Sequence, residues 1–229
     1  ELYSWAKLLD KRLSGQGRLD LYVQALEKMA KNPHIPQLFR DIFKNAFLPY
    51  RDTETLHLFL KEINNFTYDH SENLGNAFEY LLSVLGSQGD AGQFRTPRHI
   101  IDFIVEVVDP KKNETILDPA CGTAGFLISS YKHIRKHNSL NFDPQKEKSN
   151  ARIVTGATAT ETILQDKAVY RGDNLTPENK KNIAKNIAGY DISPDMVKLS
   201  KVNMYLHGFQ DPKISEYDTL SSEERWGET

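Results

Sequence analysis

The sequence predicts an α/β fold in which an all-helical N-terminal domain precedes the first part of a domain built around a parallel sheet. Three observations support this prediction. Apolar residues recur at helical spacing through the first 85 residues. Two short apolar runs follow, at 115–117 and 187–192, and each reaches an acidic residue near its end. A helical pattern follows each run, and strand, turn and helix in that order are typical of open α/β sheets.

The N-terminal part is expected to contain five amphipathic helices and no strand. Glycines and prolines separate the helical segments from one another. Short connections between such helices are typical of a helical bundle, so we interpret the apolar stripes as core packing. The first apolar residues of the five segments are Leu2, Leu19, Leu38, Leu56 and Leu74.

The glycine-rich stretch at 86–92 is the strongest domain boundary in the sequence. We therefore expect a helical domain at residues 1–90 and a second domain at 91–229. Residues from about 138 to 184 are interpreted as a long excursion between the first two strands of the sheet. No metal site is predicted, because the histidines of the N-terminal part lack metal-like spacing: His34, His57 and His70.

Composition limits the classes of function. The net charge of −2 argues against a chain that grips nucleic acid alone, because neutralising phosphates requires clustered Lys and Arg. DNA contact through one face or through a partner stays open. The single cysteine, Cys121, excludes an internal disulfide and favours a cytoplasmic location. No apolar run is long enough to cross a bilayer, so no membrane association is expected.

The stretch 118–127, between the first strand and its helix, carries the clearest signal for ligand binding. Gly122 and Gly125 lack the Cβ that would block a ligand from approaching the backbone. The spacing is not that of a dinucleotide site, and the lysine of a phosphate loop is absent. Asp118 would repel a pyrophosphate but attract a cation or a donor group. The turn therefore predicts a nucleoside that carries positive charge.

Two further acids follow later strands. Asp191 lies at the carboxyl end of the second strand, where α/β sheets bind ligands, and it can accept hydrogen bonds from both ribose hydroxyls. Ser193 and Pro194 already supply the cap and first residue of the next helix, which favours a ligand role for Asp191 over a capping role. Asp218 can accept from an adenine amino group, although an Asp-Thr pair in a loop is common.

A helix is also expected to begin near Thr96 and Pro97. Thr96 is a suitable N-cap, and Pro97 suits the first helical position. A plain helix start accounts for this pair. Because glycines and Phe94 precede it, such a helix start can also hold a carboxylate.

Taken together, these stretches resemble the modification (methylation) subunit of type I restriction-modification systems. That family consists of adenine-N6 DNA methyltransferases that use S-adenosylmethionine. The resemblance implies a partial Rossmann-like S-adenosylmethionine-dependent methyltransferase domain, acting with a specificity subunit, a restriction subunit and double-stranded DNA. The matching motifs lie at 92–98 (GQFRTPR), 118–127 (DPACGTAGFL), 189–195 (GYDISPD) and 203–208 (NMYLHG).

The resemblance also implies roles for individual residues. One segment corresponds to the part of the family that closes over the methionine end of the cofactor: Gln93, Phe94, Arg95, Thr96, Pro97 and Arg98. A second set lines the methionine and the ribose: Asp118, Gly122, Thr123, Ala124 and Gly125. Asp191 takes the ribose hydroxyls, and Asp218 corresponds to the acid that recognises the adenine.

The family's catalytic Asn-Pro-Pro-aromatic motif lies beyond the third strand, and no Asn-Pro-Pro occurs in the 229 residues. That motif holds the flipped adenine and hydrogen-bonds its exocyclic amine. We therefore expect an N-terminal fragment that carries no catalytic residue and is inactive alone. Two other interpretations stay open. The first is a nicotinamide-dependent oxidoreductase, which the glycine spacing and the 96–97 segment disfavour, and the second is a non-catalytic module for subunit assembly.

Overall fold

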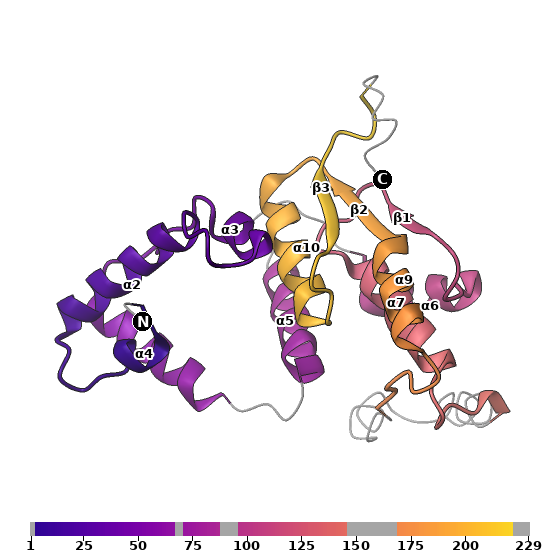
Figure 1. The fold of residues 1–229 in the computed structure, drawn as a ribbon, viewed down its shortest axis with the longest axis horizontal. Helices are drawn as coiled ribbons and strands as arrows, with labels where there is room; N and C mark the ends of the chain where they lie inside the picture. Colours follow the sequence, from indigo (N-terminus) through magenta and orange to yellow (C-terminus); the bar gives the residue numbers. More distant parts are fainter. Residues whose placement is uncertain (1–2, 67–70, 88–95, 146–168, 222–229) are drawn as a thin grey trace. The chain divides into compact units, whose positions relative to one another are not determined.

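The computed structural model describes residues 3–66, 71–87, 96–145 and 169–221 of the chain (Figure 1). It divides into two compact units. The first comprises Glu1–Gln93 and Ser193–Pro212, and the second comprises Phe94–Ile192 and Lys213–Thr229. The segment after the second strand therefore groups with the N-terminal helices. The domain boundary expected at residue 90 stays a prediction.

All five helices expected in the N-terminal part are present. Three of them begin at residues whose side chains cap the helix. Ser4 Oγ accepts from Lys7 N at 3.3 Å, Ser14 Oγ accepts from Gly17 N at 3.1 Å, and Asp52 Oδ2 accepts from Thr55 N at 2.7 Å. Three leucines on two helices form a buried cluster at Leu19, Leu56 and Leu60. The five helices are α1 (Trp5–Leu8), α2 (Gly15–Met29), α3 (Gln37–Phe43), α4 (Thr53–Asn65) and α5 (Ser71–Ser87).

Helix α10 (Pro194–Leu206) packs against α3 and α5 within the first unit. The rings of Phe39 and Tyr205 meet edge to face, with centroids 5.0 Å apart. On α5, a Cβ at Gly75 would lie 2.8 Å from Cε1 of the buried His207. The small residue therefore allows α5 to approach the end of α10.

The second unit contains a parallel three-stranded sheet, as the sequence predicts. The strands β1 (Ile116–Asp118), β2 (Ile187–Asp191) and β3 (Lys213–Glu216) lie in the order β1-β2-β3 (Figure 1). Asp118 lies opposite Gly189, and Asp191 lies opposite Glu216. Helix α6 (Arg98–Val108) precedes β1, and α7 (Gly125–His137) follows it. The predicted α/β fold class is confirmed.

Helix α9 (Pro177–Asn186) was not predicted and lies partly within the expected excursion. It begins with a capping box, in which Thr176 Oγ1 accepts from Asn179 N at 3.1 Å and Asn179 Oδ1 accepts from Thr176 N at 3.3 Å. Ile183 is its one buried residue, so the sequence carries no apolar stripe to reveal it. Residues 146–168 of the excursion lie outside the described residues.

No helix in the described part of the chain has the length and apolar character needed to cross a membrane.

Candidate functional site

The carboxyl ends of the three strands meet at one edge of the sheet, because the strands are parallel and in register. Two hydrogen bonds connect the segments that leave this edge. Thr219 Oγ1 donates to the carbonyl of Pro119 at 3.1 Å, and Tyr217 N donates to the carbonyl of Asp191 at 3.1 Å. The turn after β1 is thereby tied to the segment that follows β3.

The turn after β1 is also held directly by β2. Cys121 N donates to the carbonyl of Tyr190 at 2.8 Å. Gly122 N donates to Asp191 Oδ2 at 2.9 Å. The structure thus brings together the acid and the glycine turn that the sequence singled out, although they are 69 residues apart.

Two residues of this turn have left-handed backbone conformations. Gly122 has a φ of 53°, and a Cβ at this position would meet no other atom within 4 Å. The backbone at Gly122 therefore faces open space. Ala124 has a φ of 65° and is the N-cap of α7. Because alanine has no polar side chain, it leaves the first N–H groups of α7 without a side-chain acceptor at the cap.

The other glycines here allow close packing of protein against protein. A Cβ at Gly125 would lie 3.1 Å from Ile101 Cδ1 on α6. A Cβ at Gly189 would lie 2.9 Å from Leu127 Cδ1 and 3.0 Å from the sulfur of Cys121. The space that Gly125 leaves is thus filled by α6, whereas the sequence suggested that it admits a ligand. Its backbone N–H still belongs to the start of α7.

The electrostatics of the turn are dominated by two acids. Burial raises the pKa of the Asp118 carboxyl above its ordinary value, and the negative charge of Asp191 raises it further. The hydrogen bond from Ala120 N to Asp118 Oδ1, at 3.1 Å, acts in the opposite direction. The ionised form of Asp118 is therefore less favourable than that of an unperturbed aspartate, and a cation placed beside it would stabilise it.

The remaining predicted ligand residues are less closely assembled. Asp218 is exposed, and its Oδ1 accepts from Leu220 N at 3.0 Å within a local turn. Its segment starts at the same sheet edge as the glycine turn. Thr123 follows Gly122 in that turn and is half-buried. Gln93, Phe94 and Arg95 lie outside the described residues.

The start of α6 corrects one expectation from the sequence. Pro97, and not Thr96, is the N-cap, and the helix begins at Arg98. Pro97 has an extended ψ of 141°, while its carbonyl already accepts from the N–H groups of Ile100 and Ile101. Thr96 is therefore one residue too early to cap the helix. Arg98 Nε lies 3.4 Å from Asp102 Oδ1, one turn further along α6.

A hollow of about 650 Å³ lies against α6, β1 and α7. It reaches Asp118 and Pro119 at the end of β1, but Asp191 is not among its described lining residues. Of the two acids, the hollow therefore touches Asp118 alone among the described residues. Its apolar lining includes Ile104, Val108, Leu117 and Phe126.

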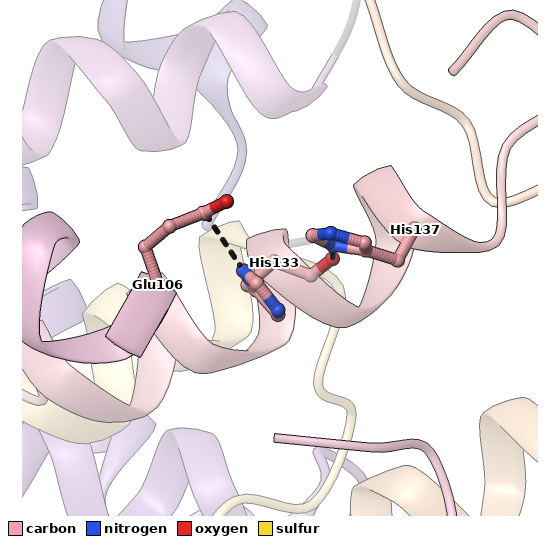
Figure 2. Close-up of side chains that lie close together, drawn as sticks. All are labelled: Glu106, His133 and His137. Carbon is pink, nitrogen blue, oxygen red and sulfur yellow. Dashed lines mark hydrogen bonds and ion pairs between the residues drawn. The ribbon is translucent and has the colours of Figure 1, made fainter. Parts of the chain in front are cut away.

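A second polar cluster, which the sequence did not reveal, lies between α6 and α7 (Figure 2). Glu106 on α6 and His133 and His137 on α7 each offer a metal-ligating atom, all within 4.8 Å of one another. The one available signal was the spacing of the two histidines, which places them on the same helical face. Glu106 is 27 residues before His133 and is brought there by helix packing.

Residues 69–228 match the model of the N-6 DNA Methylase family. The methylase subunit of the type I restriction enzyme EcoEI from Escherichia coli is 34% identical over 108 residues, which cover 46% of this chain and 22% of that protein. The MjaVIII methylase subunit from Methanocaldococcus jannaschii is 25% identical over 224 residues, or 85% of this chain and 36% of that protein.

One solved structure supports the same relationship. It is a modification subunit assigned to a type I restriction enzyme from Vibrio vulnificus YJ016, with a TM-score of 0.54 and 26% identity. The match covers 80% of this chain and 31% of that protein. The chain therefore spans between 22% and 36% of the length of these relatives.

Proposed function

The chain belongs to the N-6 DNA methylase family, and on that premise we propose that the protein containing it methylates the N6 position of adenine in DNA with S-adenosylmethionine as the donor. The single observation that carries the proposal is the contact between Gly122 N and Asp191 Oδ2, at 2.9 Å, in the turn that Asp118 opens. This contact brings the glycine turn, with its backbone N–H groups, together with Asp118 and Asp191 at the carboxyl edge of a parallel sheet.

The negative charges of Asp118 and Asp191 are complementary to the positive charges of this donor. S-adenosylmethionine carries a sulfonium and an ammonium group and, when bound, supplies the methyl group. Burial and the charge of Asp191 raise the pKa of Asp118, so a nearby positive charge would make its ionised form more favourable. A cationic ligand would provide that charge, whereas the phosphates of a dinucleotide would add to the repulsion. The two acids therefore favour the sulfonium donor over NAD.

The backbone of the turn suits the other end of the same ligand. The first N–H groups of a helix attract an anion, and α7 begins directly after Ala124. We assign the methionine carboxylate of the donor to this helix start and to the turn of Gly122 and Thr123. The open space beside Gly122 leaves room for this approach.

Asp191, at the end of β2, and Asp218, after β3, complete the proposed cofactor site. Asp191 Oδ2 already accepts one backbone N–H, and a carboxylate has further acceptor positions for ribose hydroxyls. Asp218 is assigned to the adenine amino group through Oδ2, because its Oδ1 accepts from Leu220 N. Thr96, Pro97 and Arg98 are assigned to the methionine end, together with Gln93, Phe94 and Arg95.

Type I relatives suggest a division of labour. The named relatives are methylase subunits of type I restriction enzymes. We therefore propose that the whole protein acts as a modification subunit beside a specificity subunit and a restriction subunit, on double-stranded DNA. The net charge of −2 supports delegated DNA recognition. The 229-residue chain lacks an Asn-Pro-Pro motif, so alone it is expected to bind the donor without turnover.

Calorimetry on the 229-residue chain with S-adenosylmethionine and, separately, with NAD tests this proposal. We expect binding of S-adenosylmethionine and none of NAD. Asp191→Asn should weaken the binding by about 10- to 100-fold, because a hydrogen bond to a charged group contributes about 1.5–3 kcal/mol. Asp20→Asn, which changes an exposed acid on α2, serves as the control and should leave the affinity unchanged. Binding of NAD alone would overturn the proposal in favour of an oxidoreductase.

A further inference from the structure

The cluster between α6 and α7 contains four side chains of types that bind metal ions. Glu106 lies in the last turns of α6, and Asp109 is the residue that ends this helix. His133 and His137 lie one turn apart on α7, so they project from the same face. Their ring centroids are 4.0 Å apart. Figure 2 shows the carboxylate of Glu106 turned toward His133, with His137 on the next turn.

The hydrogen bond of His137 to a backbone carbonyl indicates which of its ring nitrogens carries a proton. Nδ1 lies 3.0 Å from the carbonyl oxygen of His133. A carbonyl oxygen only accepts, so Nδ1 carries the hydrogen and Nε2 of the neutral ring holds a lone pair. An unprotonated imidazole nitrogen is the form that binds a metal ion.

His133 has the complementary arrangement. Its Nε2 lies 2.9 Å from Asp109 Oδ1, and its Nδ1 lies 3.2 Å from Glu106 Oε2. Asp109 is itself held in place by an ion pair between its other oxygen and Lys111. If Nε2 donates to Asp109, Nδ1 presents its lone pair to the space next to the Glu106 carboxylate.

This pattern of bonds is the one that metal-binding histidines have. Such residues donate their second ring N–H to a carboxylate or a backbone carbonyl, which orients the ring and raises its basicity. His133 has Asp109 for this purpose, and His137 has the carbonyl of His133. His137 thus has Nε2 for a metal ion, and His133 has Nδ1 for it in the tautomer in which Nε2 donates to Asp109.

The distances agree with a shared ion. Zinc lies about 2.0–2.1 Å from nitrogen or oxygen ligands, so two ligands of a tetrahedral ion are about 3.4 Å apart. The 3.2 Å between His133 Nδ1 and Glu106 Oε2 is close to this value. Each of the three residues also has a possible ligand atom within 4.8 Å of one on each of the other two. The Glu106 side chain is 60% exposed and has the freedom to close the remaining gap.

We propose that Glu106, His133 and His137 form a binding site for a divalent transition-metal ion of the zinc class, with Asp109 positioning His133. Two imidazoles and one carboxylate form a ligand set that zinc accepts and that calcium and magnesium, which prefer all-oxygen sites, do not. A water molecule completes the tetrahedron. The ion fastens α6 to α7, the two helices that flank β1 and its glycine turn.

A competing arrangement uses the same side chains without a metal. A protonated His133 would bridge the carboxylates of Glu106 and Asp109 as an ion triad. In that case His137 contributes nothing to the cluster, and the chain gains no affinity for zinc. The two arrangements therefore differ in their dependence on His137.

Titration of the chelator-treated 229-residue chain with Zn²⁺ against a chromophoric competitor distinguishes them. We expect one ion per chain, a rise in the unfolding temperature, and a loss of affinity of at least about tenfold in Glu106→Gln and in His137→Ala. His34→Ala removes an exposed histidine on the other unit and should change nothing. Cobalt should give the absorption bands of a tetrahedral ion in the unaltered chain.

Two results would overturn the proposal. One is an unaltered chain that takes up no zinc at stoichiometric concentrations. The other is zinc binding that persists at full affinity in either Glu106→Gln or His137→Ala. Both ligands are partly exposed at the side chains that change, so these variants are expected to fold as the unaltered chain does.

Discussion

Asp109 and Asp118 lie in the same unit, one after α6 and one at the end of β1, but their surroundings act on them in opposite directions. The Lys111 ammonium, and then His133, lower the pKa of the Asp109 carboxyl to about 2. Burial, and then the charge of Asp191, raise the pKa of Asp118. The chain thus provides a positively charged partner, Lys111, for Asp109, whereas it places a second negative charge beside Asp118.

We propose that this difference distinguishes an acid that binds a ligand from one that holds a neighbouring side chain in place. An acid whose partners come from its own chain is compensated and has a positioning role, as Asp109 has toward His133. The ionised form of an acid that is half-buried and repelled by another carboxylate becomes more favourable when a cation binds beside it. Perturbed carboxylates of the second kind are found at ligand sites, and this supports the role proposed for Asp118.

The largest effect, on the free energy of unfolding, is expected from a core truncation in α7, the helix that connects the glycine turn to the histidine cluster. Leu127 is fully buried on α7, which carries the glycine turn at its start and the histidines at its end. Leu127→Ala should lower the free energy of unfolding by about 2–5 kcal/mol, the usual cost of such a core truncation. Denaturant unfolding measures it. Leu220→Ala, at a side chain that is 95% exposed, is the control, and an equal loss there would contradict the account.

The next largest effect is a difference in ligand affinity between variants of Asp118 and Asp109. Asp118→Asn should weaken binding of S-adenosylmethionine by about 10- to 100-fold, because it removes a charge that faces the proposed sulfonium and ammonium groups. Asp109→Asn should leave this affinity unchanged and instead weaken binding of zinc. Calorimetry with each ligand on both variants gives a two-by-two comparison. Equal losses of S-adenosylmethionine affinity in the two variants would show that the acids do not differ in role.

A smaller effect concerns the backbone beside Asp118. Gly122→Ala introduces a Cβ at a φ of 53° and should cost about 1 kcal/mol of folding stability, with S-adenosylmethionine binding weakened at least about tenfold. Gly208→Ala is a matched control, because Gly208 also has a positive φ and open space but lies in the first unit. The control should lose stability without losing affinity. If both variants bind equally well, the ligand does not approach Gly122.

The smallest effect is a dependence of stability on pH. Because the pKa of Asp118 is raised in the folded chain, the folded state binds more protons than the unfolded state between the ordinary value of 3.8 and the raised value. Stability from this group therefore falls as the pH rises through that window and does not recover above it. Asp118→Asn should abolish this slope and be more stable than the unaltered chain at neutral pH. A variant that is less stable at pH 7 would contradict the direction of the shift.

The sheet edge was predictable, because parallel strands bring their carboxyl ends together whatever their separation in sequence. Asp118, Asp191 and the glycine turn were accordingly placed correctly relative to one another. The cluster of Glu106, His133 and His137 was not predictable, because it depends on how α6 packs against α7. No periodicity within a single segment contains that information.

Two identical dipeptides illustrate why helix starts are less certain. Thr176 caps α9 and Pro177 is its first residue, whereas Thr96 stands one residue before the cap of α6. Asn179 completes a capping box with Thr176. The corresponding residue after Thr96 is His99, which lacks the short amide that closes such a box. The dipeptide alone therefore does not determine where the helix begins.

The most direct test of the account is the pKa of the Asp118 carboxyl, followed by NMR titration of the 229-residue chain with and without S-adenosylmethionine. In the free chain we expect a value above 3.8, because of burial and the charge of Asp191. The value should fall when the cationic donor binds, since a nearby positive charge favours the ionised form. A pKa that stays the same or rises on addition of the donor would contradict the claim that Asp118 faces a cationic ligand.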